Sequence, residues 1–119
     1  MKNHDNEKLM LSYESGVRHP EASGMEHLNL FQVRSRLARI KGELTDSQRA
    51  RLERADTELL RRASEFLNSI EQIADLESWR RRDRVPPSQW WWYLDVVVNV
   101  PVMIVQPPIH GFMAEVAPA

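Results

Sequence analysis

The residue types that most often carry catalysis or bind metals are sparse in this sequence and do not gather at useful spacings. The chain has four histidines, His4, His19, His27 and His110, and no two of them stand three or four positions apart, the spacing at which one helix presents two metal ligands. It has no cysteine, which excludes thiolate zinc sites and cysteine nucleophiles. We therefore expect neither a metal nor a cofactor.

Paired carboxylates could perform acid–base chemistry, but the pairs here belong to a region that is acidic throughout. Asp75 with Glu77 and Glu53 with Asp56 are such pairs, and a solvated helical face explains them better than a catalytic dyad does. The glycines are too widely separated for a phosphate-binding loop, and no serine nucleophile elbow is present. The sequence predicts a protein that is not an enzyme.

Basic residues are concentrated in two places, which raises the question of nucleic-acid binding. A dimer that placed two such clusters on one face would suit duplex DNA, as in a small bacterial-type regulator such as an antitoxin or repressor. The simpler interpretation is that the first cluster pairs with acidic side chains of a neighbouring helix and the second lies at the negative end of a helix dipole. The residues concerned are Arg34, Arg36, Arg39 and Lys41 in the first cluster and Arg80, Arg81 and Arg82 in the second. Nucleic-acid binding is therefore the alternative function and not the favoured one.

Length and charge set the broad class of protein. The 119 residues are enough for one domain with its own core. The 16 basic and 17 acidic residues nearly cancel, so no overall field attracts the molecule to nucleic acid or to an anionic membrane. No signal peptide or transmembrane segment is evident, and together with the lack of cysteine this predicts a cytoplasmic protein.

The spacing of apolar residues predicts a mainly α fold built on an antiparallel helical hairpin over residues 25–84. A first helix is expected from Met25, ending near Gly42. Thr45 and Gln48 form the pattern of a capping box, so a second helix is expected to begin at Asp46. Residues 1–24 are expected to be a loosely held, flexible arm.

The second helix has no proline or glycine before Pro86 and is expected to run to about residue 83. At 1.5 Å per residue it would be about 55 Å long and would project from a domain about 35 Å across. The distal part of its apolar stripe, with Phe66, Ile70 and Ile73, would then need cover. We expect this cover from the C-terminal segment of the chain, from a second copy in a coiled-coil-like dimer or higher oligomer, or from another protein.

Residues 85–119 form a tryptophan-rich segment with aromatic side chains at Trp90, Trp91, Trp92 and Tyr93. The alternation of its apolar residues and its content of β-branched residues predict an extended, β-like conformation. It is expected to pack along the second helix as core, to anchor a protein partner, or to lie on a membrane surface. The function predicted from the whole sequence is protein–protein interaction and assembly, with another protein or with itself.

Overall fold

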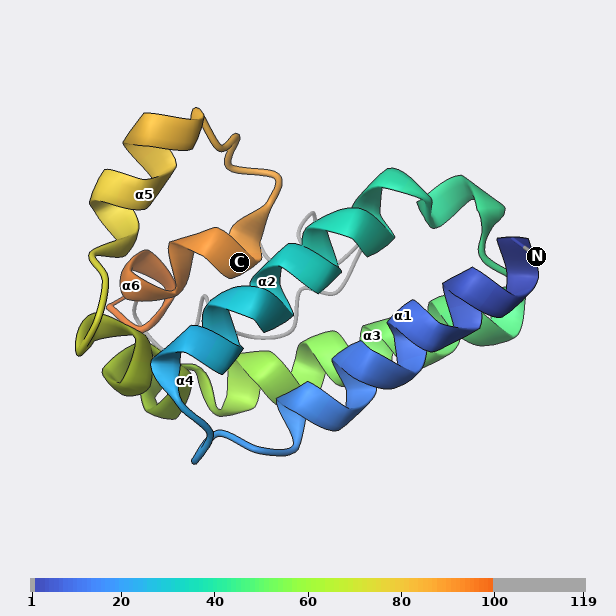
Figure 1. Ribbon diagram of the computed structural model, residues 1–119, viewed down its shortest axis with the longest axis horizontal. Coiled ribbons are helices and arrows are strands. Elements are labelled where there is room, and N and C mark those ends of the chain that lie inside the picture. The colour runs from blue at the N-terminus through green and yellow to red at the C-terminus, as the bar shows by residue number, and fades with distance from the viewer. Residues whose placement is uncertain (1, 100–119) are drawn as a thin grey trace, which may run out of the picture.

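The computed structural model describes residues 2–99 of the chain, and these residues fold almost entirely as helices (Figure 1). Within that range there are six α-helices, two short 3-10 helices and no strand. They are α1 (Lys2–Val17), α2 (Gly24–Arg39), η1 (Lys41–Glu43), α3 (Asp46–Arg61), α4 (Ala63–Glu71), α5 (Leu76–Asp83), η2 (Trp90–Tyr93) and α6 (Leu94–Val97). The prediction of a mainly α fold is confirmed for this part of the chain.

The N-terminal segment is the regular helix α1, and the prediction of a loosely held arm is wrong. Its buried residues, Asn6, Met10, Tyr13 and Val17, recur at intervals of three and four and form one helical stripe. This stripe packs α1 against both α2 and α3; in Figure 1 α2 runs above α1 and α3 runs behind it. A Cβ atom at Gly16 would collide with Cδ1 of Leu30, so glycine allows the close approach of α1 and α2.

Helices α2 and α3 begin where the capping residues place them. Ser23 caps α2 by accepting a hydrogen bond from the backbone N–H of Glu26 at 3.2 Å. Thr45 caps α3: its hydroxyl accepts from the backbone N–H of Gln48, and the Gln48 side chain accepts from the N–H of Thr45, both at 3.0 Å. The predicted capping box is therefore confirmed.

The long projecting helix is absent, because the chain from 46 to 83 is divided into α3, α4 and α5. The first break is a kink at Arg62, and the second is the turn before Leu76. At the second break the Asp75 carboxylate accepts hydrogen bonds from the backbone N–H of Glu77 at 3.3 Å and from the Ser78 hydroxyl at 2.8 Å. An aspartate that caps a new helix in this way competes with continuation of the old one.

Helix α2 occupies the centre of the fold, and the predicted simple hairpin of α2 with α3 is not what the structure contains. Helix α2 packs mainly on α1 and α4, while α3 packs on α1 (Figure 1). The kink at Arg62 turns α4 towards α2, and this gives the apolar face of α4 a partner within the chain. The core is formed by residues of all these helices, among them Met10, Tyr13, Phe31, Leu37, Leu59, Phe66, Ile70, Leu76 and Leu94.

The tryptophan-rich segment is helical where the structure describes it, so the prediction of an extended conformation is wrong for residues 90–97. Backbone hydrogen bonds within the segment close its turns, including Trp92 N–H to the Gln89 carbonyl at 3.0 Å and Val98 N–H to the Leu94 carbonyl at 2.9 Å. Helix α6 packs on α4, and η2 packs on α5. Packing of the aromatic side chains outweighs the weak preference of β-branched residues for strands. The part of the predicted segment from 100 to 119 lies outside the described residues.

Candidate functional site

A buried polar cluster centres on Arg34 in the middle of α2. Its Nε and Nη2 donate to the two carboxylate oxygens of Asp56 at 2.9 and 3.0 Å, and the Tyr13 hydroxyl donates to Oδ1 of the same carboxylate at 2.6 Å. The cluster thereby joins α1, α2 and α3. The Arg34 side chain is only 7% exposed, so the residue proposed for nucleic-acid contact instead holds three helices together.

Aromatic rings surround the Arg34 guanidinium. Its Cζ lies 4.1 Å from the ring centroid of Trp91 and 6.0 Å from that of Trp90, a cation–π arrangement in which the ring faces replace water. Its Nη1 is buried and has no hydrogen-bond partner. Burial raises the pKa of Tyr13 well above its ordinary value, and the negative charge of Asp56 adds to the effect although Arg34 opposes it. In this cluster the Tyr13 phenol therefore keeps its proton to unusually high pH, and Arg34 and Asp56 form a fixed ion pair.

Trp91 and Trp92 are core residues. Both are buried, and the indole Nε1–H groups of both donate to one acceptor, Oγ of Ser35, at 3.0 and 2.9 Å. Phe31 meets the Trp92 ring edge-to-face, with a centroid distance of 5.4 Å, and Trp79 stacks on it at 5.5 Å. These side chains are therefore enclosed by the protein's own helices and do not form an exposed partner anchor.

Arg80 fastens the tryptophan-rich segment to α5. Its Nη1 donates to Oδ1 of Asp95 at 2.6 Å and to the carbonyl of Trp92 at 3.0 Å, and its Cζ lies 4.4 Å from the ring centroid of Tyr93. The Tyr93 hydroxyl donates to the carbonyl of Val85 at 2.6 Å. Arg80 and the half-buried Tyr93 thus close the loop between α5 and α6.

The other residues considered for nucleic-acid contact lie on the surface. Arg81 pairs with Glu77 at 2.9 Å, and Arg82 lies beside Asp83 at 3.2 Å. The remaining exposed members are Arg36, Arg39 and Lys41. The structure therefore divides the predicted set: Arg34 and Arg80 are committed to internal ion pairs, and the others face solvent.

The predicted assembly stripe is also divided. Phe66 and Ile70 are buried because α4 packs on α2, and the ring of His27 lies against Phe66 with a centroid distance of 4.4 Å. Their assignment as a seam for a second chain is therefore wrong, since their own chain encloses them. Ile73 differs: it follows the end of α4 and is exposed.

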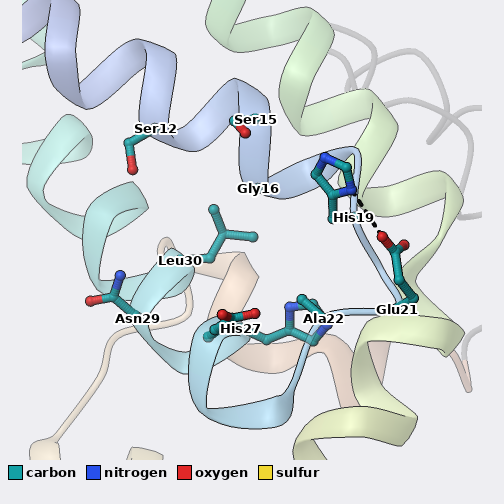
Figure 2. A pocket seen from close by; sticks show the side chains of 10 residues that line it. Ser12, Ser15, Gly16, His19, Glu21, Ala22, His27, Asn29 and Leu30 are labelled. Atoms are coloured by element: carbon teal, nitrogen blue, oxygen red, sulfur yellow. Dashed lines mark hydrogen bonds and ion pairs between the residues drawn. The ribbon is translucent and has the colours of Figure 1, made fainter.

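A polar cleft of about 520 Å³ lies between the end of α1 and the start of α2 (Figure 2). Nδ1 of His19 lies 2.9 Å from Oε2 of Glu21 at its rim, and both side chains are exposed. Ser12, Ser15 and Asn29 add hydroxyl and amide groups to its wall. The polar groups of the cleft can hydrogen-bond a small polar molecule. If His19 acted as a general base, its free Nε2 atom would have to contact a reacting group. None of the described side chains forms a hydrogen bond with that atom.

Comparison of the chain with protein-family models, with curated proteins and with solved structures gives no match. Residues 2–99 contain no group of three or more histidine, aspartate and glutamate side chains arranged to hold a metal ion. Each helix in that range is too short or too polar to cross a membrane.

The expected pairing of the first basic cluster with acids of a neighbouring helix occurs at Arg34, but the individual partners were not predicted, and Asp56 was expected to face solvent. Asp56, Ser35 and Asp95 each accept hydrogen bonds from an arginine or from tryptophans that the sequence did single out. For Tyr13 a signal was available, because it lies in the stripe of three and four spacings with Met10 and Val17. For the other three no local pattern indicates the partner.

Proposed function

We propose that this protein is a non-enzymatic assembly protein that binds a second copy of itself through an apolar patch formed by Met25 and Ile73. The observation that carries the proposal is their exposure: Met25 is 67% exposed and Ile73 is 52% exposed, although both are large apolar side chains. Single exposed apolar residues are ordinary on protein surfaces, whereas apolar surface gathered at one place is typical of contact surfaces. We refer to this pair as the Met25–Ile73 patch.

Met25 and Ile73 belong to the same helix junction, because α2 begins directly against the end of α4. A Cβ atom on Gly24 would collide with the backbone carbonyl oxygen of Ser69 and would lie 3.0 Å from Cγ1 of Ile73. The Ser69 hydroxyl also donates to the carbonyl of Ala22 at 3.3 Å, which holds the same junction from the other side. Met25, the next residue after Gly24, therefore lies at the same junction as Ile73.

A symmetric dimer would use the Met25–Ile73 patch of each subunit. Burying a side chain of this size contributes up to about 1.5–3 kcal/mol. In a dimer with a two-fold axis each contact occurs twice, so a small patch yields double its own burial energy. Exposed polar side chains follow or precede the patch in the chain, Glu26 after Met25 and Gln72 before Ile73, and supply the polar rim that such contacts have.

The DNA-linked alternative is weaker in this geometry. Of the predicted basic contacts, Arg34 and Arg80 are held by Asp56 and Asp95 inside the fold and are not free to meet phosphates. Only the five exposed residues of the predicted set, Arg36, Arg39, Lys41, Arg81 and Arg82, are free to contact DNA phosphates. An affinity for duplex DNA that falls steeply with salt would support it.

The cytoplasm is the compartment that we propose, on the lack of cysteine.

The test is a mass measurement by light scattering over a range of micromolar concentrations. The full chain is expected to show a mass above the 13.9 kDa of the monomer. Ile73→Asp places a charge in the patch and is expected to reduce the mass to that of the monomer. Leu11→Asp is the matched control: Leu11 is an exposed apolar residue on α1, 53% exposed, and its replacement is expected to leave assembly unchanged.

Two results would contradict the proposal. The first is a monomeric mass for the full chain at every concentration. The second is an equal loss of assembly in both variants, which would show that added charge and not the Met25–Ile73 patch controls association. Circular dichroism of each variant verifies that the helices are intact.

A further inference from the structure

A second hollow, of about 380 Å³, lies on another face of the protein, where α1 packs along α3. Its floor is formed by the buried side chains of Val17 and Ala55. Its walls are almost entirely charged and come from both helices and from the residue that follows α1: Glu14, Arg18, Arg51, Arg54 and Glu58. Three arginines and two glutamates therefore surround one small depression.

Both glutamates in this wall already accept hydrogen bonds from an arginine, and Arg51 is shared with a third carboxylate, because its Nη1 also donates to Oε1 of Glu7 at 3.0 Å. Nε and Nη2 of Arg51 donate to the two carboxylate oxygens of Glu14 at 2.9 and 2.7 Å, a bidentate pair. Glu58 accepts from Nη2 of Arg61 at 2.6 Å and lies 3.1 Å from Nε of Arg62. These arginines lower the pKa of both carboxyl groups, which stay ionised and paired.

The other two arginines of the hollow, Arg18 and Arg54, take no part in these ion pairs. Both are exposed, and neither makes a hydrogen bond or close ion pair with a residue of the described part of the chain, although the positive charge of Arg18 helps to lower the pKa of Glu14. Arg18 follows the last residue of α1 and Arg54 lies in the middle of α3, so the packing of α1 on α3 brings two guanidinium groups without hydrogen-bond partners among the described residues to one hollow. Each presents a planar fork of donors that matches a pair of oxygens on one anion.

We propose that this hollow binds a phosphate group held between Arg18 and Arg54. Two guanidinium groups balance the charge of a phosphate dianion, whereas a carboxylate would leave one of them without a counter-charge. A phosphate monoester also fits, because its organic part would lie over Val17 and Ala55 while its phosphate meets the arginines. The site shares no residue with the Met25–Ile73 patch and does not depend on the proposed assembly.

The test is a titration of the full chain with inorganic phosphate, followed by NMR through the arginine Nε–H signals. Sodium chloride at matched ionic strength is the control for general salt effects. Saturable shifts of the Arg18 and Arg54 signals are expected with phosphate and not with chloride. A parallel titration with glycerol 3-phosphate distinguishes the source of the group: tighter binding than inorganic phosphate indicates a monoester as ligand, and equal or weaker binding indicates free phosphate.

Variants decide whether the two arginines are the ligands. Arg18→Gln and Arg54→Gln are each expected to weaken phosphate binding by at least about ten-fold, since each removes one of two charge-assisted contacts. Arg36→Gln, an exposed arginine on α2, is the matched control and is expected to bind as the unchanged chain does. Shifts that follow ionic strength equally in chloride, or undiminished binding in either Gln variant, would overturn the proposal. Circular dichroism confirms that each variant is folded.

Discussion

Arg34 and Trp91 lie face to face in the core, with the guanidinium carbon 4.1 Å from the ring centroid, while the edge of the same guanidinium holds Asp56. One side chain therefore joins the tryptophan-rich segment to α2 and α2 to α3. Because the guanidinium is enclosed, its interactions with Asp56 and Trp91 are not screened by water.

Loss of Arg34 is expected to destabilise the fold strongly. Arg34→Met would leave the Asp56 carboxylate without its cation at a site that is 19% exposed, and breaking a buried pair by removing one partner costs about 3–5 kcal/mol. Urea denaturation followed by circular dichroism measures the change. Arg36→Met, on the exposed side of α2, is expected to change the free energy of unfolding by no more than about 0.5 kcal/mol. Equal effects of the two variants would show that the pair contributes little.

Ser35→Ala is expected to weaken the fold by about 2 kcal/mol or more. The substitution removes the acceptor of both indole N–H groups, Trp91 and Trp92, and each buried donor left without a partner costs about 1–3 kcal/mol. Ser64→Ala, at an exposed position of α4, is the control for the helix propensity of alanine. If both variants unfold at the same urea concentration, the result would show that water can replace the Ser35 hydroxyl as acceptor without loss of stability.

Arg84→Gly is expected to stabilise the protein by about 1 kcal/mol. Arg84 ends α5 in the left-handed conformation, with a φ of 54°, where glycine has no steric penalty. Arg82→Gly, inside α5, is expected to have the opposite effect, a loss of about 1 kcal/mol. Thermal unfolding of both variants measures the difference. A loss of stability in Arg84→Gly would instead reveal that the Arg84 side chain contributes to the fold.

The alkaline stability of the protein is expected to depend on Tyr13. Burial, then the charge of Asp56, raises the pKa of its phenol well above the ordinary value of 10.0. The folded state thus keeps a proton that the unfolded state releases, so the free energy of unfolding decreases as the pH rises above about 10, by up to about 1.4 kcal/mol per pH unit. Below that pH the contribution is fully present.

Tyr13→Phe provides the check on this pH dependence. The variant loses the hydrogen bond to Asp56 and is expected to be less stable at neutral pH, but its stability should fall less steeply above pH 10 than that of the unchanged chain. Urea denaturation at several pH values, with tyrosinate absorbance recorded in parallel, measures both effects. Identical slopes for the two proteins would show that Tyr13 ionises as easily in the folded state as in the unfolded one.

Local features of the fold were predictable from the sequence. The helix that begins near Met25, the capping box of Thr45 and Gln48, and the mainly α character all depend on residues within four positions of one another. The Asp75 cap that begins α5 was also a local signal, but the continuous apolar stripe from Leu52 to Leu76 favoured one uninterrupted helix. Side-chain capping and apolar periodicity both depend on residues a few positions apart, and here the Asp75 cap outweighed the periodicity.

The tertiary structure decided which of the singled-out residues meet. Arg34 and Asp56 are 22 positions apart, and Trp91 and Ser35 are 56 apart, so no local pattern connects them. Neighbouring residues are enough to predict that residues 2–99 are mainly helical and where α2 and α3 begin. Only the packing of α1 and α4 on α2 decided that Phe66, Ile70 and the buried tryptophans form the core while Met25 and Ile73 face solvent, since burial depends on which surfaces the whole chain brings together.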